Sequence, residues 1–217
     1  MNAGIQFKVC GIMTAEAADF SVRHGASYLG FNFYPKSPRY LSPEKFREFA
    51  HRLPIGKKVA VLVEPTAAEL AALQGLGFDF FQIHFRAELP LAQIAGWSKA
   101  VGPERLWLAP KLPPGLDLPA AWLPFARFFM LDTFSADRFG GTGQTGDWAK
   151  FGRHQLAYPA VTWILAGGLN PDNIGAALRG SGARFVDVSS GVESAPGVKD
   201  HARLKAFAAA VHKAAGA

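Results

Sequence analysis

The segment KVAVLVEPTAAELAALQGLGFDFFQIH, residues 58–84, contains one full unit of the pattern that decides the fold. Its two ends, 58–63 and 80–84, are short runs of β-branched and aromatic residues, which are typical of buried strands. Residues 67–76 between them are rich in alanine and leucine and predict a helix. A strand, a helix and a second strand in this order indicate two parallel strands joined by a crossover helix.

The same alternation extends over the whole chain and gives eight strand–helix units. The other predicted strands are 7–10, 28–33, 105–109, 128–132, 161–166 and 185–189, and the other predicted helices are 14–24, 43–52, 91–101, 119–125, 147–152, 171–178 and 202–214. Eight such units close most simply into an α/β fold of the (β/α)8 TIM-barrel type. We therefore predict one domain over residues 1–217. A doubly wound open sheet is the alternative, although the early chain lacks the glycine fingerprint of dinucleotide binding.

Composition restricts the class of protein. Hydrophobic residues make up 49% of the 217 residues and charged residues 18%, which is enough to form a large core and excludes intrinsic disorder. The single cysteine excludes an intramolecular disulfide and suits a reducing compartment. No segment approaches the roughly 18 consecutive apolar residues of a membrane-spanning helix, and residues 1–10 lack the basic start of a signal peptide. We expect a cytoplasmic protein without a membrane partner.

The formal net charge is +6, because 23 lysines and arginines oppose 17 acidic residues. The basic residues are scattered, and Lys57-Lys58 is the only adjacent pair. Nucleic-acid binding usually shows a basic stripe, whereas a general positive field steers small anions toward an enzyme. We expect an anionic small-molecule substrate and no nucleic acid, with nucleic-acid binding as the rival interpretation.

The active site of such a barrel lies at the carboxyl ends of the strands, which makes Cys10 the first candidate. Alternation places Lys8 and Cys10 on one face of the first strand and Val9 on the other. If Val9 packs against the helices, Cys10 points into the mouth, where a nearby lysine would favour the thiolate. The competing interpretation is a buried structural cysteine.

Three further polar residues follow predicted strands. Arg39 lies in a proline-restricted loop after the second strand, and its planar fork could bind a carboxylate or phosphate, unless it is simply solvated. His84 ends the fourth strand, where substrate contact is more plausible than a role as base. Asp132 ends the otherwise apolar sixth strand, with no helix start nearby for it to cap.

Glycines follow the three last strands and predict a phosphate site. Their backbone N–H groups can approach an anion closely, and the loops after strands seven and eight of barrels often bind phosphate. The candidates are Gly141, Gly143, Gly167, Gly168, Ser190 and Gly191. The sequence shows no cluster of metal ligands, so we expect neither a metal nor a cofactor. A thiol and a carboxyl group without a cofactor suit an isomerisation by proton transfer.

Taken in order, these residues resemble the phosphoribosylanthranilate isomerase family of tryptophan biosynthesis. The six similar motifs are Lys8-Val9-Cys10-Gly11, residues 30–39, Gln82-Ile83-His84, Leu131-Asp132 together with residues 140–143 and Asp147-Trp148, residues 166–169 and residues 186–193. The resemblance spans the chain, and six motifs in the right order make it specific.

The resemblance implies an Amadori rearrangement of N-(5'-phosphoribosyl)anthranilate to 1-(2-carboxyphenylamino)-1-deoxyribulose 5-phosphate. It implies that Asp132 is the general acid that opens the ribose ring and Cys10 the base that removes the C2 proton. Arg39 would bind the anthranilate carboxylate, the glycines and Ser190 the phosphate, and Asp187 would lie near the sugar or the amine. Cys10 must then ionise near neutral pH, while Asp132 must keep its proton.

Two departures from the family pattern concern the mouth of the barrel. Phe85 follows His84 where the family usually has glycine, and Gly146 precedes Asp147-Trp148 where the family often has an aromatic residue. We expect Phe85 to reshape the mouth near the anthranilate ring. Two alternatives remain. One is another aminoaldose isomerase, such as the dual-substrate enzyme with two aspartates, against which Cys10 argues. The other is a non-catalytic barrel that binds a phosphate ligand. The sequence is compatible with a monomer or a homodimer.

Overall fold

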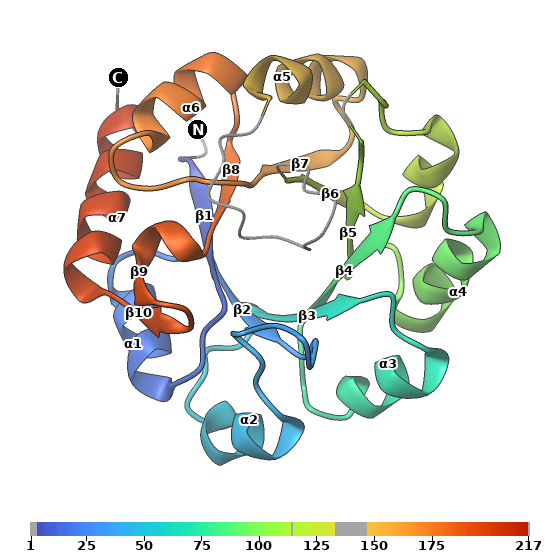
Figure 1. The fold of residues 1–217 in the computed structure, drawn as a ribbon, viewed down its shortest axis with the longest axis horizontal. Helices are drawn as coiled ribbons and strands as arrows, with labels where there is room; N and C mark the ends of the chain where they lie inside the picture. The colour runs from blue at the N-terminus through green and yellow to red at the C-terminus, as the bar shows by residue number, and fades with distance from the viewer. Residues whose placement is uncertain (1–3, 114, 133–146, 217) are drawn as a thin grey trace.

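The computed structural model describes residues 4–113, 115–132 and 147–216. Eight parallel strands form a closed barrel in chain order, which confirms the predicted fold (Figure 1). The strands are β1 (Gln6–Cys10), β2 (Tyr28–Asn32), β3 (Lys58–Val63), β4 (Phe80–Arg86), β5 (Leu106–Lys111), β6 (Phe128–Leu131), β7 (Thr162–Leu165) and β8 (Phe185–Val188). β1 pairs with both β2 and β8, and the latter pairing closes the barrel.

Helices surround the barrel on the outside (Figure 1). They are α1 (Ala15–Arg23), α2 (Pro43–Ala50), α3 (Ala67–Gln74), α4 (Leu91–Val101), α5 (Trp148–Ala157), α6 (Ile174–Ser181) and α7 (His201–Ala215), with the 3-10 helix η1 (Ala120–Phe125) between β5 and β6. η1 is not an α-helix because Pro124 lies inside it and cannot donate a backbone hydrogen bond. No helix of the described residues is long and apolar enough to cross a membrane.

Two predicted helices differ from the observed ones. α5 continues to Ala157, well beyond the predicted 147–152, because Phe151 and His154 bury one face of it despite Gly152 in between. α6 begins at Ile174 instead of residue 171, because Asn170 Oδ1 accepts the backbone N–H groups of the two residues before the helix and forms a turn there.

Alternation along the strands produces two apolar layers. Val9 belongs to the large layer between the strands and the helices. Cys10 belongs to a smaller layer inside the barrel, whose other members are Val59, Val61, Trp107, Ala109, Met130, Ile164, Ala166 and Phe185. This is the arrangement that the sequence predicted for the first strand, and it points Cys10 into the barrel.

Aromatic rings fill the amino end of the barrel. The first residues of the four even-numbered strands are Tyr28, Phe80, Phe128 and Phe185. Their rings surround the buried Trp107 with centroid distances of 5.1–5.5 Å. Side chains from alternate strands forming one layer are typical of this fold. The aromatic layer closes one end and leaves the polar residues to the carboxyl ends of the strands.

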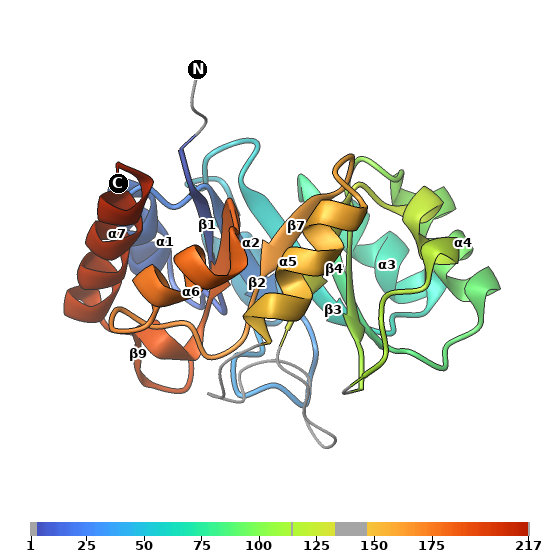
Figure 2. The same ribbon diagram turned by 90° about the horizontal axis from the view of Figure 1, so that it is seen from above.

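A short hairpin follows β8 and was not predicted. The 3-10 helix η2 (Ser190–Val192) leads into β9 (Glu193–Ala195) and β10 (Val198–Lys199), which pair antiparallel. These strands are too short and too polar to produce an alternating pattern in the sequence. Figure 2 shows β9 and the loop that follows β2 at one end of the barrel, and the beginning of β1 at the other.

Candidate active site at the carboxyl ends of the strands

A cavity of about 510 Å³ opens at the carboxyl ends of the strands, within the size range of small-ligand sites. Most of the residues that the sequence singled out line it. They are Cys10, Arg39, His84, Asp132, Gly167, Gly168, Asp187 and Ser190. Gly141 and Gly143 lie outside the described residues. The barrel therefore collects into one cavity side chains that are separated by up to 180 positions in the sequence.

Cys10 is the last residue of β1, and Gly30 of β2 is its register partner. A Cβ atom on Gly30 would lie 2.7 Å from Lys8 Cε and 3.0 Å from Cys10 Sγ. Real Cβ atoms essentially never show the shorter of these contacts, so any larger residue at position 30 would displace these side chains. Gly30 thus leaves the space that Lys8 and Cys10 occupy inside the barrel.

Beneath Cys10, the fully buried Lys8 forms an ion pair with Asp187, with Nζ and Oδ1 2.7 Å apart. Burial by itself lowers the pKa of Lys8, but Asp187 and Cys10 outweigh it, so this pKa lies above its ordinary value. Burial raises the pKa of Asp187, and Lys8 partly opposes that rise. Asp187 reaches the cavity wall, as expected of a residue near the sugar, and it also provides the counter-charge of Lys8.

The surroundings of Cys10 act in opposite directions on the ionisation that the family resemblance implies. Burial raises the pKa of the Cys10 thiol, and the nearby charge of Lys8 lowers it by less. Asp187, the counter-ion of Lys8, adds to the rise because its negative charge also disfavours the thiolate. Burial and Asp187 thus both disfavour the thiolate of Cys10, whereas Lys8 favours it.

Asp132 follows β6 directly and lines the cavity. β7 and β8 separate it from β1 around the barrel, so Asp132 and Cys10 approach the cavity from different sides. This is the placement that an acid and a base require if they act on different atoms of one ligand.

His84 is a neutral residue of the cavity wall. Burial, together with the charge of Lys8, lowers the pKa of His84 to about 3. Its Nε2 lies 2.7 Å from Nε2 of the buried Gln82, which also donates to Met130 Sδ at 3.4 Å. An imidazole of such low pKa favours ligand contact over proton uptake near pH 7. Gln82 lines the same cavity, although sequence reasoning used it only as part of a motif.

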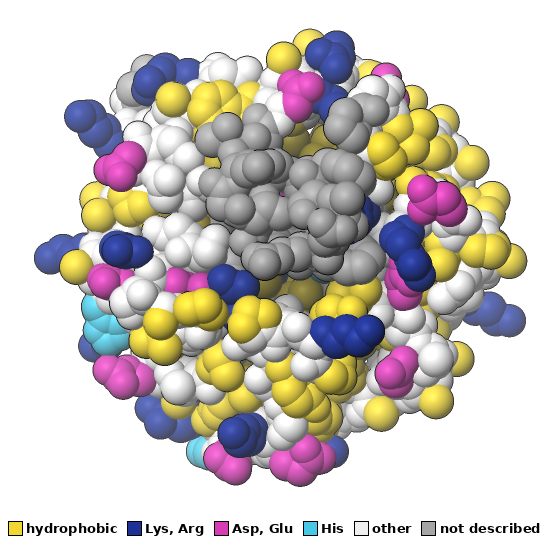
Figure 3. Space-filling view, viewed as in Figure 1, with side chains coloured by type: hydrophobic (Ala, Val, Ile, Leu, Met, Phe, Trp, Pro, Cys, Tyr) yellow, Lys and Arg dark blue, Asp and Glu magenta, His cyan; other side chains and the backbone are white. Residues whose placement is uncertain are grey.

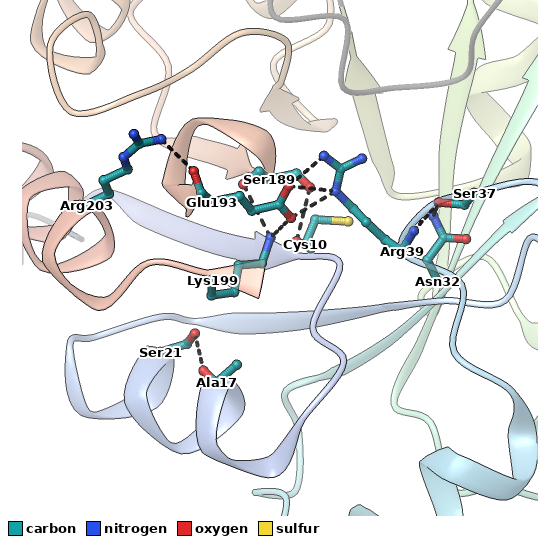
Figure 4. Close-up of polar contacts among 10 residues, drawn as sticks. All are labelled: Cys10, Ala17, Ser21, Asn32, Ser37, Arg39, Ser189, Glu193, Lys199 and Arg203. Carbon is teal, nitrogen blue, oxygen red and sulfur yellow. Dashed lines mark hydrogen bonds and ion pairs between the residues drawn. The ribbon is translucent and has the colours of Figure 1, made fainter. Parts of the chain in front are cut away.

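Arg39 lies in the loop after β2, and its backbone N–H donates to Ser37 Oγ at 3.1 Å. Its guanidinium binds Glu193 of β9, with Nη2 and Oε2 2.7 Å apart (Figure 4). Lys199 of β10 donates to the other oxygen of Glu193 at 2.6 Å. Sequence reasoning missed this role of Glu193, and it missed Lys199 altogether, because both residues belong to the unpredicted hairpin.

The glycine prediction divides into two outcomes. Gly167 and Gly168 line the cavity after β7 and have φ angles of +96° and +63°, which favour glycine. Gly191 is not among the residues that line the cavity, so its assignment as a phosphate ligand stays a prediction. A Cβ atom there would overlap the carbonyl oxygen of Leu169. Gly191 also allows the loop after β8 to pack against the loop after β7.

Comparison with known proteins agrees with this geometry. The family model for N-(5'phosphoribosyl)anthranilate (PRA) isomerase matches residues 7–210. The chain belongs to this family. The isomerase of Magnetococcus marinus is 39% identical over 213 residues, which cover 97% of this chain and 96% of that protein.

Solved structures of the isomerase family show the same barrel. The phosphoribosyl anthranilate isomerase of Thermus thermophilus aligns with a TM-score of 0.79 and 29% identity, covering 96% of this chain and 99% of that one. Another phosphoribosyl anthranilate isomerase, solved in complex with reduced 1-(o-carboxyphenylamino)-1-deoxyribulose 5-phosphate, aligns with a TM-score of 0.72 and 32% identity over 95% and 98% of the two chains.

The prediction that Phe85 reshapes the mouth of the barrel is wrong. Phe85 does not reach the mouth of the barrel, because β4 continues through it and alternation turns it toward the helices. Its ring packs edge-on against Trp97 and Trp122, with centroids 5.7 and 5.2 Å away. Phe85 is therefore a core residue. Gly146, the other departure, lies outside the described residues.

Proposed function

We propose that this isomerase converts N-(5'-phosphoribosyl)anthranilate to 1-(2-carboxyphenylamino)-1-deoxyribulose 5-phosphate with Asp132 as general acid and Cys10 as general base. The observation that carries the proposal is the cavity shared by these two side chains, Arg39 and the glycines after β7. Membership in the isomerase family supports the overall reaction.

In the first step Asp132 gives its proton to the ribose ring oxygen. The C1–O bond breaks, and the anthranilate nitrogen forms a double bond with C1 and carries the positive charge. In the second step the Cys10 thiolate removes the proton from C2. The electrons of the C2–H bond form a double bond between C1 and C2, and the second electron pair of the C1–N double bond returns to the nitrogen and neutralises it. The resulting enolamine tautomerises to the ketose. No electrons enter or leave the substrate, so the reaction requires no external oxidant or reductant.

The positive charge of the intermediate favours the thiolate form of Cys10, which is the form that can accept the C2 proton. Burial raises the pKa of Cys10, and Lys8 is already paired with Asp187. A cationic nitrogen in the same cavity provides a second opposite charge, which favours the thiolate. Ring opening thus prepares the base for the following step.

We assign the two anionic groups of the substrate, the carboxylate and the phosphate, to different residues of the cavity. Arg39 binds the anthranilate carboxylate, since its fork matches the two carboxylate oxygens. Gly167, Gly168 and Ser190 bind the phosphate through backbone N–H groups, as the loops after strands seven and eight of barrels often do. His84 and Asp187 then lie along the sugar. We place the protein in the cytoplasm, where Cys10 stays reduced, as a monomer or a homodimer that light scattering can distinguish.

Freshly generated N-(5'-phosphoribosyl)anthranilate tests the function, because its conversion changes the anthranilate fluorescence. We expect the unmodified protein to be active, and Cys10→Ser and Asp132→Asn to lose nearly all activity while their circular dichroism stays unchanged. A folded but inactive unmodified protein would favour the binding barrel. An active Cys10→Ser variant would preserve the reaction but remove Cys10 as the base.

A further inference from the structure

We propose that Glu193 and Lys199 are positioning residues that orient Arg39 so that one edge of its guanidinium selects a ligand bearing a carboxylate. This inference rests on the proposed function, because it concerns how Arg39 recognises the substrate. It extends that function to two residues of the β9–β10 hairpin and to the origin of specificity.

The contacts of Arg39 leave one defined edge for a ligand. Nε of Arg39 donates to both oxygens of Glu193, at 2.9 and 3.1 Å, and Nη2 donates to Oε2 at 2.7 Å. A guanidinium has five N–H donors in a rigid fork, and the Nη1–Nη2 edge offers two of them in parallel. No hydrogen bond joins Nη1 to the part of the chain that the structure describes. Figure 4 shows this nitrogen on the side away from Glu193.

The carboxylate that holds Arg39 is itself fixed from its other side. Lys199 Nζ donates to Glu193 Oε1 at 2.6 Å and to the backbone oxygen of Ser189 at 3.3 Å. The side chains of Glu193 and Lys199 are only 3% and 0% exposed, compared with 14% for Arg39. Groups held in this way keep a binding residue in one orientation before the ligand arrives.

The stem of Arg39 is confined by a second contact. Gly11, directly after Cys10, has a φ of +76°, and a Cβ atom there would lie 2.5 Å from Arg39 Cδ. The hairpin also packs closely on this region, because a Cβ atom on Gly197 would overlap Met13 Sδ and lie 3.4 Å from the backbone oxygen of Pro38. The loops after β1 and β2 and the hairpin therefore enclose Arg39 together.

The charge of this cluster favours an anionic ligand. Arg39 and Lys199 are two cations that share the single carboxylate of Glu193, which leaves a net charge of +1 in a mostly buried place. Buried charges are stable when they are paired. A ligand carboxylate on the open edge of Arg39 completes the pairing, whereas a ligand that lacks this group leaves the charge uncompensated.

Two ligands that differ only in the carboxylate test the proposal by calorimetry. The first is reduced 1-(o-carboxyphenylamino)-1-deoxyribulose 5-phosphate, and the second is the corresponding phenylamino compound. Glu193→Gln raises the net positive charge of the cluster, which by itself would favour the first ligand, so a loss of affinity reports the orientation of Arg39. We expect the variant to weaken the first ligand about tenfold or more, since hydrogen bonds to charged groups contribute that much. The second ligand should change by less than about twofold because it does not depend on the orientation of Arg39.

Two further variants keep the test decisive. Arg203→Ala is the matched control, because Arg203 donates to the backbone oxygen of Glu193 and not to its carboxylate, and it should leave the ratio of the two affinities unchanged. Lys199→Met preserves the Arg39–Glu193 pair but removes the restraint and the net charge. It should weaken only the first ligand, and it provides the measurement if Glu193→Gln does not fold.

The outcomes separate this proposal from the proposed function. Equal weakening of both ligands by Glu193→Gln, or an unchanged ratio in Lys199→Met, would overturn the positioning role while the isomerase assignment stands. If neither ligand binds the unmodified protein, the proposed function fails, and the recognition role of Arg39 fails with it.

Discussion

Lys8 Nζ lies 2.7 Å from Asp187 Oδ1 inside the barrel, and the two residues are direct register partners on β1 and β8. The pair lies two residues before Cys10 on the same face of β1, so the base of the proposed reaction is next to a neutral ion pair instead of a free cation. The reactivity of Cys10 therefore depends on both partners, and each can be removed separately.

Removal of Lys8 should damage both folding and chemistry. We expect Lys8→Met to lower the free energy of unfolding by about 3–5 kcal/mol, because it leaves Asp187 buried without a counter-charge. Chemical denaturation measures this loss. The double variant Lys8→Met/Asp187→Asn should recover most of the stability but not the activity. If the single and double variants are equally stable, the ion pair does not have the assumed energetic role.

Cys10 is the only cysteine, so its ionisation can be followed by alkylation. Because burial raises the pKa of the thiol, the rate of reaction with iodoacetamide should reach half its maximum above the ordinary thiol pKa of about 8.5. Asp187→Asn should shift this midpoint to lower pH, because it removes a negative charge that disfavours the thiolate. A midpoint below 8 in the unmodified protein, about half a unit under the ordinary value, would contradict the effect of burial.

A side chain added at Gly30, between β1 and β2, should reduce stability and activity more than one added at a glycine on the outside of the barrel. Gly30→Ala places a Cβ atom 2.7 Å from Lys8 Cε, so we expect a loss of about 1–3 kcal/mol from overpacking and a strong fall in kcat. Gly96→Ala, within α4, is the control, because a Cβ atom there meets nothing within 4 Å. That variant should keep its activity and gain up to about 1 kcal/mol of stability.

The charge cluster of the hairpin should make stability depend on pH. Burial raises the pKa of Glu193, but its bonds with Arg39 and Lys199 outweigh burial, so the pKa lies below its ordinary value of 4.5. A carboxyl group of this kind stabilises the fold above its unfolded pKa, and the contribution disappears as the pH falls through the folded pKa. Urea denaturation should show decreasing stability from about pH 5 downward.

Glu193→Gln should make that decrease shallower. Glu64 and Glu69 also have lowered pKa values, through Arg86 and through the backbone and side chain of Thr66 respectively, so part of the pH dependence will remain. An identical pH profile in the unmodified protein and in Glu193→Gln would show that the cluster does not contribute.

A substitution of Phe85 tests whether this residue contributes to the core or to the mouth of the barrel. Its ring is fully buried against Trp97 and Trp122, so Phe85→Ala should cost about 3–5 kcal/mol of stability. Because the ring faces the helices, KM at a temperature where the variant is folded should stay within about twofold of the unmodified value. A larger rise in KM would contradict this placement and indicate that Phe85 faces the ligand.

The order of strands and helices, and with it the barrel, can be predicted from the amino-acid sequence alone. The apolar residues that mark a buried strand are neighbours in the sequence, as in Lys58–Val63, so a local pattern is enough to predict the strand. The same rule placed Cys10 inside and located the site residues that follow strands, among them Asp132 and Gly167. The sequence also indicated the family, because its motifs occur along the chain in the order that is typical of the family.

The pairing and the charge of those residues follow from contacts in the folded chain. Lys8 and Asp187 are 179 positions apart, and Arg39 and Glu193 are 154 apart, so no local pattern can connect them. Likewise, the overlap that makes Gly191 a packing residue depends on Leu169 in another loop. Burial and long-range contacts set the pKa of Cys10 and the open edge of Arg39, because these depend on distance in space and not on distance along the chain.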